Sequence, residues 1–286
     1  MEYVTLNDGN KMLQLGFGVF QVTDLKQAEQ AVSDALAVGY RLIDTAAAYG
    51  NEEAVGAAIK KSGIAREDIF VTSKLWVDHF TYEKAQQGIE DSLNKLGLDY
   101  IDLYLLHQPY GDTAGAWRAL VEAQKAGKIK SIGVSNFAPD QLTNLELMSS
   151  VKPALNQIEV SPWYQHNESV DFMQGEDVQV EAWAPFAEGK HGIFTDERIA
   201  AIGKKYGKSN GQVILRWLLQ RGIVVIPKSV HKERMAENFD VFDFELTAED
   251  MQVMAALDKN ESQFFDHRDP QAIKNIFGAS IKALRD

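Results

Sequence analysis

The apolar positions of this chain fall into two alternating patterns. Short runs rich in β-branched and aromatic residues predict buried strands, and longer segments with apolar residues at i, i+3, i+4 and i+7 predict amphipathic helices. The expected strands are residues 15–20, 41–45, 69–75, 101–107, 129–134, 154–160, 178–183 and 223–227. The expected helices between them are residues 25–38, 52–61, 82–96, 115–126, 139–148, 196–206 and 212–221.

The first expected helix shows how these segments are recognised. Its apolar stripe consists of Ala28, Ala31, Val32, Ala35 and Leu36. Thr23 or Asp24 can cap the N-terminus and Gly39 can end the helix, so the stripe would face a sheet. Segment 168–175 is too short to assign from its pattern.

Strands that alternate with helices eight times predict a closed parallel (β/α)8 barrel, the TIM barrel. Residues 4–6 and 11–13 flank an Asp-Gly turn at Asp8 and Gly9, which predicts a short N-terminal hairpin over the barrel floor. After the last strand we expect a helix over residues 247–257 and a tail, 264–286, that is half loop and half helix. No linker or low-complexity stretch interrupts the chain, so residues 1–286 are expected to form a single domain.

Composition narrows the class of protein. The formal charge of −12 argues against a nucleic-acid or anionic-membrane partner, because both would repel the chain's field. The absence of cysteine excludes disulfides, thiolate nucleophiles and Cys-ligated metals. No apolar segment approaches the roughly 20 residues that a membrane-spanning helix needs. The first residues show neither the basic nor the apolar region of a signal peptide. We therefore expect a cytoplasmic protein.

Four polar residues follow or end neighbouring strands. Asp44, Lys74 and His107 each end a predicted strand, and Tyr49 lies in the turn after Asp44. Side chains alternate along a strand, so inward-facing strand ends would bring these groups together at one mouth of the barrel. A phenol, an ammonium, a carboxylate and an imidazole at one place form a proton-donating site.

The chain contains no standard phosphate loop. The segment Gly16-Phe-Gly18-Val-Phe-Gln21 begins like a dinucleotide-binding fingerprint, but Gln21 occupies the position of the third glycine. The better anion site is the basic segment 228–234, after the last strand, where phosphate sites of such barrels lie; it could also be a solvated basic turn. The six histidines are scattered, so no metal site is expected.

Five motifs in order resemble the aldo-keto reductase family. They are Ile43-Asp-Thr-Ala-Ala-Ala-Tyr-Gly-Asn-Glu52, Leu105-Leu-His-Gln-Pro109, Ile132-Gly-Val-Ser-Asn-Phe137, Asn156-Gln-Ile-Glu159 and Ile226-Pro-Lys-Ser229. The segments 181–186 and 265–270 are similar to the prokaryotic branch of 2,5-diketo-D-gluconate reductases.

This resemblance implies an NADP-dependent oxidoreductase that converts aldehydes and ketones to alcohols. Tyr49 would give its proton to the carbonyl oxygen as general acid. Lys74 would ease that proton off the phenol, Asp44 would keep Lys74 charged, and His107 would position the carbonyl oxygen.

The resemblance also implies how the cofactor, NADPH/NADP⁺, is held. Ser135, Asn136 and Gln157 would bind the nicotinamide carboxamide, and Trp183 would stack on the ring. Lys228, Ser229, Val230 and Arg234 would surround the 2′-phosphate that NADH lacks, and Glu237 and Asn238 would bind the adenine. Several relatives carry Arg at the position of His231, so the preference for NADPH over NADH is expected to be looser.

The substrate pocket is expected to be apolar and open. Phe20 and Trp76 resemble the aromatic walls of the family, His107 would share the pocket with them, and Trp163 could contribute from the loop after the sixth strand. We expect small-molecule carbonyl substrates such as dicarbonyls, aromatic aldehydes or keto sugars, and a monomeric enzyme.

The sequence also permits three other functions. The scaffold could serve a nucleotide-binding regulatory subunit, since fold alone does not fix function. Glu159 and Glu181 could be the carboxylate pair of a barrel glycoside hydrolase, although Glu181 would lie one layer below the mouth. Lys74 could instead form a Schiff base with a carbonyl substrate.

Overall fold

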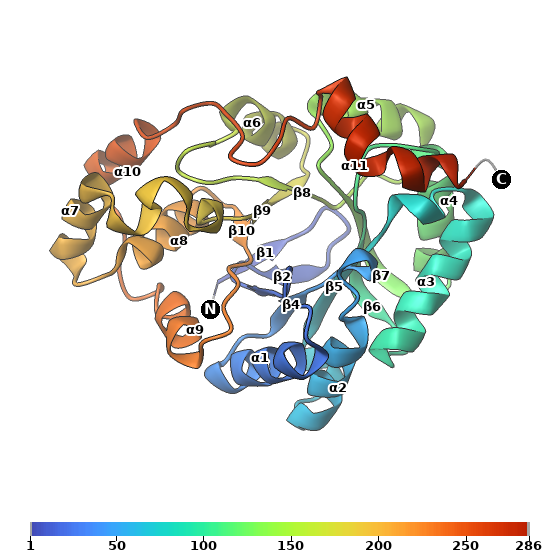
Figure 1. The fold of residues 1–286 in the computed structure, drawn as a ribbon, viewed down its shortest axis with the longest axis horizontal. Helices are drawn as coiled ribbons and strands as arrows, with labels where there is room; N and C mark the ends of the chain where they lie inside the picture. Colours follow the sequence, from blue (N-terminus) through green and yellow to red (C-terminus); the bar gives the residue numbers. More distant parts are fainter. Residues whose placement is uncertain (1, 285–286) are drawn as a thin grey trace.

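The computed structural model describes residues 2–284 and confirms the (β/α)8 barrel (Figure 1). Eight parallel strands form one sheet in the order β10-β9-β8-β7-β6-β5-β4-β3, and a parallel bridge from Leu15 to Val225 joins its two edges. The strands are β3 (Phe17–Gly18), β4 (Leu42–Asp44), β5 (Phe70–Leu75), β6 (Ile101–Leu106), β7 (Ile129–Ser135), β8 (Leu155–Glu159), β9 (Gln179–Trp183) and β10 (Val224–Val225).

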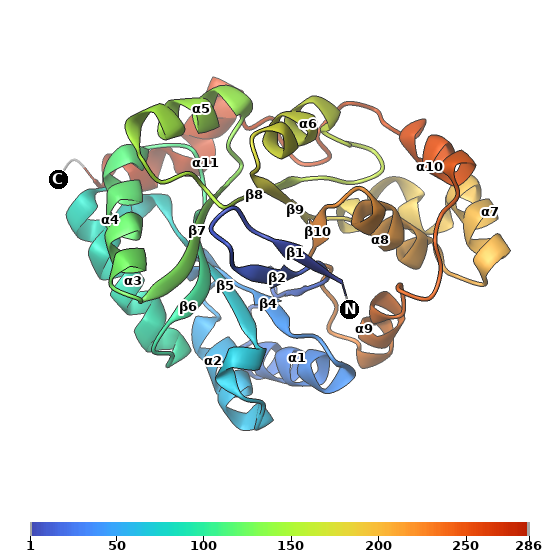
Figure 2. The same ribbon diagram turned by 180° about the vertical axis from the view of Figure 1, so that it is seen from behind.

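The predicted hairpin covers one end of the barrel, as Figure 2 shows. It consists of β1 (Tyr3–Thr5) and β2 (Lys11–Leu13), with Gly9 in the turn at a φ of 88°. Leu6, Met12 and Leu13 belong to one apolar cluster with the inward residues of the strands, including Leu42 and Leu103. The hairpin is thus an apolar plug, which leaves the opposite end of the barrel for polar chemistry.

Helices surround the sheet and pack on its outer face (Figure 1). They are α1 (Leu25–Val38), α2 (Glu52–Ser62), α3 (Tyr82–Leu96), α4 (Thr113–Lys125), α5 (Pro139–Met148), α6 (Asn167–Gly175), α7 (Glu197–Tyr206), α8 (Asn210–Gln220), α9 (Lys232–Phe239), α10 (Ala248–Ala255) and α11 (Pro270–Lys282). Asp24, one of the two predicted caps of α1, accepts a hydrogen bond from the Gln27 amide at 2.7 Å, and Gly39 ends the helix. No helix of residues 2–284 is long and apolar enough to cross a membrane.

A few elements differ from those that the sequence pattern predicts. Segment 168–175, left unassigned, lies in helix α6. Helix α9 was not predicted, because Met235 is its one fully buried side chain and its pattern therefore resembles a solvated loop. The first and last strands are shorter than expected; beyond β10 the chain reaches Pro227, which has no N–H to donate to a neighbouring strand.

Candidate active site

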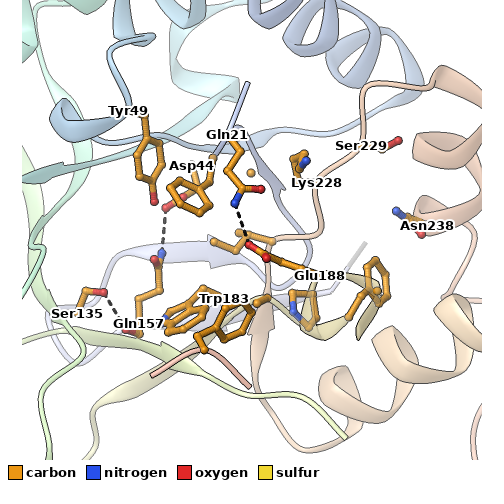
Figure 3. Close-up of a pocket in the computed structure, with 18 of the residues that line it drawn as sticks. Gln21, Asp44, Tyr49, Ser135, Gln157, Trp183, Glu188, Lys228, Ser229 and Asn238 are labelled. Carbon is orange, nitrogen blue, oxygen red and sulfur yellow. Dashed lines mark hydrogen bonds between the residues drawn. The ribbon is translucent and has the colours of Figure 1, made fainter. Parts of the chain in front are cut away.

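A cavity of about 1200 Å³ opens at the carboxyl ends of the strands (Figure 3). Strand ends, the loop after β10 and the C-terminal tail all contribute to its wall. This is the end of a barrel where inward side chains from several strands converge. All the residues expected to bind cofactor line it, as do Asp44, Tyr49, His107, Phe20 and Trp76.

Lys74 is the centre of the proton-donating group. Its ammonium donates to Asp44 Oδ1 at 2.7 Å, to the Thr45 carbonyl at 2.8 Å and to the Tyr49 hydroxyl at 3.4 Å. Lys74 and Asp44 are buried, whereas Tyr49 is half-buried and lines the cavity. The three donors of the ammonium are therefore used, and one of them fixes the phenol at the cavity wall.

Short local structures put these groups in place. Asp44 ends β4, and the chain then makes the 3-10 turn η1 (Ala47–Tyr49), which Gly50 ends at a φ of 66°. His107 directly follows β6, and its amide donates to the Leu75 carbonyl, so the imidazole is held next to the end of β5. The structure therefore brings together the four side chains that the strand ends placed at one mouth.

Burial controls the protonation of this group. It raises the pKa of the Tyr49 phenol above its ordinary value, and the Lys74 ammonium opposes that rise without reversing it. Burial alone would lower the pKa of Lys74, but the neighbouring Asp44 carboxylate and the Tyr49 hydroxyl raise it above its ordinary value. The phenol thus remains protonated and the lysine charged, which are the forms that proton donation requires.

His107 is a neutral imidazole in this environment. Burial and the nearby Lys74 charge hold its pKa well below the ordinary value for histidine. The ring packs edge-on against Tyr49, with centroids 5.6 Å apart, and against Trp76, at 5.1 Å. A neutral ring has one N–H donor, which can hold an oxygen atom beside the Tyr49 hydroxyl.

A second group of polar side chains forms the floor beside the phenol. Ser135 Oγ donates to the Gln157 carbonyl at 2.9 Å, and Trp183 Nε1 donates to Asn136 Oδ1 at 2.9 Å. Gln157 Nε2 donates to Asp44 Oδ2 at 2.9 Å (Figure 3). Among residues 2–284, Gln157 Oε1 accepts no hydrogen bond, and it belongs to a residue of the cavity wall. An amide acceptor beside a flat indole suits a planar carboxamide-bearing ring.

The basic segment lies at the other end of the same cavity. Lys228, Ser229, Val230, Arg234 and Asn238 contribute to its wall. Lys228 and Arg234 are exposed and form no salt bridge with any residue in the described part of the chain. In a chain of charge −12, two free cations beside the start of α9 favour an anionic group.

One expectation is wrong and one alternative is not supported. Trp163 does not reach the cavity; it is 2% exposed and packs in the layer outside the barrel. The carboxylate pair of a glycoside hydrolase is not supported, because Glu181 is buried below the mouth, as the strand alternation predicted, and is bonded to Gln157. Glu159 holds the tail through Ser262 Oγ at 2.7 Å and the Gln263 amide at 2.9 Å.

Several wall residues had no signal in the sequence. Gln21 Nε2 donates to Glu188 Oε1 at 3.0 Å, a link between two loops that both line the cavity (Figure 3). Phe264, His267 and Phe277 come from the C-terminal tail. Phe264 and His267 lie in irregular segments without a periodic pattern, and the pattern of α11, which carries Phe277, does not tell where that helix packs. Their place over the mouth is therefore evident from the fold alone.

The chain is similar to known proteins in both sequence and fold. The family model described as "Aldo/keto reductase family" matches residues 14–259. A protein named glyoxal reductase from Bacillus subtilis is 47% identical over 262 residues, which are 90% of this chain and 93% of the relative. Methylglyoxal reductase DkgA from Escherichia coli K12 is 45% identical over 90% of this chain and 94% of its own length. A Bombyx mori aldo-keto reductase solved in complex with NADP superposes with a TM-score of 0.88 at 36% identity, covering 96% of this chain and 97% of that one.

Proposed function

Because this chain belongs to the aldo/keto reductase family, we propose that it reduces small carbonyl compounds, dicarbonyls above all, with NADPH and with Tyr49 as the proton donor. The observation that carries the assignment is the Tyr49 hydroxyl held by the Lys74–Asp44 pair at the wall of the cavity. The named relatives supply the carbonyl class, since two of them are a glyoxal and a methylglyoxal reductase.

Each of the four side chains has its own role in proton transfer. His107 holds the carbonyl oxygen of the substrate next to Tyr49, and the phenol gives its proton to that oxygen as negative charge develops on it. Lys74 stabilises the resulting phenolate, and Asp44 keeps Lys74 charged. The hydroxyl is restored by a proton from solvent, which enters through the open cavity.

When bound, NADPH would supply the hydride of this reaction. Ser135, Asn136 and Gln157 would hold its carboxamide, and the half-buried face of Trp183 would support the ring. The unpaired Lys228 and Arg234 favour the 2′-phosphate, with Ser229 and Val230 beside it, and Glu237 and Asn238 favour the adenine. These roles rest on donor chemistry and on the shared cavity.

We infer broad activity on small substrates. Phe20 and Trp76 form rigid apolar walls, which accept varied carbonyl compounds because they make few specific polar contacts with them. In an assay of NADPH consumption, glyoxal, methylglyoxal and aromatic aldehydes should all be reduced, and a chelator should leave the rates unchanged. A chain that bound NADPH but reduced none of these carbonyls would favour the regulatory-subunit alternative.

The basic segment gives a test of cofactor choice. Arg234→Ala should weaken NADPH binding by about tenfold or more, the loss of one charge-assisted contact, and leave NADH binding within about twofold. Fluorescence titration with both cofactors measures this, with Lys232→Ala as the control. Lys232 lies on the same turn but pairs with Asp34 at 3.4 Å. Equal losses for both cofactors in Arg234→Ala would show that the segment does not bind the 2′-phosphate.

We further infer that residues 1–286 form one reductase domain that acts as a monomer in the cytoplasm. The support is that the family match covers residues 14–259 and that the tail beyond it completes the same cavity through Phe277. Every catalytic group comes from one chain, so the proposed reaction needs no second copy. The high negative charge disfavours a nucleic-acid partner.

A further inference from the structure

A carboxyl group that proton donation does not use lies directly below the active site. Glu181 is on β9, one inward position below Trp183, and its side chain has no exposure to solvent. Its Oε2 accepts a hydrogen bond from Gln157 Nε2 at 2.9 Å, whereas Oε1 has no partner among residues 2–284. Its neighbours in register are Gln157 on β8 and the apolar Val224 on β10. A buried carboxyl without a direct salt bridge or contact with solvent is costly, so its presence calls for a physical reason.

Gln157 connects this carboxyl to the cofactor site. Its amide nitrogen donates one hydrogen to Asp44 Oδ2 and the other to Glu181 Oε2, each at 2.9 Å. Both donors are therefore used, and the amide oxygen is the atom left for a ligand. Glu181 thus fixes which end of the Gln157 amide is available in the cavity.

Asp44, Lys74 and Glu181 form a charged cluster in which the charges balance without Glu181. Asp44 and Lys74 form a direct ion pair at 2.7 Å and cancel each other. Protonated Glu181 leaves the cluster neutral, and ionised Glu181 gives it one net negative charge. The nicotinamide ring differs by the same unit, because it is neutral in the reduced cofactor and positive in the oxidised one.

We propose that Glu181 is a positioning residue whose charge sets the preference of the site for oxidised over reduced cofactor. The inference rests on the proposed function, since it places the nicotinamide ring on Trp183 and its carboxamide at Gln157. Two residues along a strand span about 7 Å, and a unit charge pair at that distance changes an affinity by a factor on the order of ten or more at an effective dielectric constant of about 20. Ionised Glu181 therefore favours NADP⁺, and protonated Glu181 favours NADPH.

Glu181 should ionise within a pH range that can be reached in a binding experiment. Burial, with the added effect of the Asp44 charge, raises the pKa of Glu181 to about 8. Of the titratable groups near it, Lys74 and Tyr49 have pKa values raised above their ordinary ones. The pKa of His107, which packs against Tyr49, is well below its ordinary value. Burial also raises the pKa of Asp44, but its direct bond to Lys74 makes it the carboxyl that keeps the charge.

Other titratable groups should not produce the same pH dependence of the preference between the two cofactors. Burial lowers the pKa of His267, on the tail, to about 4, far from the expected change. The 2′-phosphate is present in both cofactors, so its protonation cancels in a ratio of their dissociation constants. The ratio of Kd for NADPH to Kd for NADP⁺ should therefore report Glu181 and rise with pH.

The experiment is a fluorescence titration of both cofactors between about pH 6 and 9.5. In the wild type the ratio should rise on the order of tenfold, and in Glu181→Gln, which keeps the bond from Gln157, it should stay flat. Glu159→Gln is the matched control: Glu159 is also a buried glutamate, on the adjacent β8, but it bonds to Ser262 and Gln263 instead of Gln157. This control should retain the wild-type rise.

A second readout uses the wild type alone. NADP⁺ binding near pH 8 should release a fraction of a proton to an indicator dye, and NADPH binding should release less. A wild type that binds both cofactors with a flat ratio, or a Glu181→Gln variant with the wild-type slope, would overturn the role of Glu181. A chain that bound neither cofactor would contradict the proposed function as well, so the two failures are distinguishable.

Discussion

Replacing Tyr49 with Phe should lower kcat for carbonyl reduction by on the order of a thousandfold, because the substrate oxygen then has no proton donor. The Lys74 ammonium loses one hydrogen-bond acceptor at 3.4 Å and keeps those from Asp44 and Thr45, so the fold should not change. The Kd for NADPH should stay within about twofold of the wild type, since the phenol is not among the groups proposed to bind it. Steady-state kinetics and a fluorescence titration on the same preparation measure the two quantities.

The matched control for this variant is Tyr104→Phe. Tyr104 lies on β6 and is also buried, but its hydroxyl faces the outer layer and pairs with Ser92 Oγ at 2.8 Å. Its loss should cost stability, about 1 kcal/mol for one hydrogen bond, and leave turnover unchanged. Ordinary turnover in Tyr49→Phe would show that another group gives the proton.

Lys74→Met should have the largest effect on stability, and it should lower activity as well. Without the ammonium, Asp44 keeps one hydrogen bond, from Gln157, and becomes a buried charge without a cation. Breaking a buried pair in this way costs about 3–5 kcal/mol of the free energy of unfolding. The activity should fall by roughly a hundredfold or more, because Tyr49 loses the group that opposes the rise of its pKa.

The penalty in Lys74→Met should depend on pH in a defined direction. Burial raises the pKa of Asp44, and the Lys74 charge that opposes this rise is gone in the variant. A carboxyl whose pKa is higher in the folded than in the unfolded state destabilises the fold as pH rises through that range. Urea unfolding should therefore show a larger loss at about pH 8 than at about pH 5.

Two further variants separate this effect from the loss of any lysine. Lys208→Met removes a lysine with a 7% exposed side chain, but its partners Asp240 and Asp243 are exposed, so the cost should be about 1 kcal/mol or less. Adding Asp44→Asn to Lys74→Met should recover part of the lost stability, since no buried charge remains. A Lys74→Met variant as stable as the wild type at pH 8 would contradict the buried ion pair.

The sequence was sufficient for the barrel because its signals are local and repeated. The stripe of α1 and the strand run 69–75 each depend on neighbours along the chain, and their agreement with a strand-helix alternation defines the topology. The proposed catalytic set followed from the same logic, since Asp44 and Lys74 lie at strand ends and His107 directly follows a strand. The shortened β10 was not predictable to the residue, because the pairing of a strand end depends on its partner's geometry.

What the sequence did not reveal depends on contacts between distant segments. The hydrogen bond from Gln21 to Glu188 joins residues 167 positions apart, and no pattern in the sequence of either loop predicts it. Trp163 resembles a wall residue by its place after a strand, yet the turn carries it into the outer layer. The strand alternation placed Glu181 one layer below the mouth, but its bond to Gln157 became known from the structure alone.

A crystal structure of the protein with NADP⁺ is the decisive test of the proposed site. The nicotinamide should lie on Trp183 with its carboxamide at Gln157 and with the reactive carbon facing the Tyr49 hydroxyl, which should remain within reach of Lys74. A nicotinamide bound elsewhere, or a phenol turned away from both the ring and the ammonium, would contradict it.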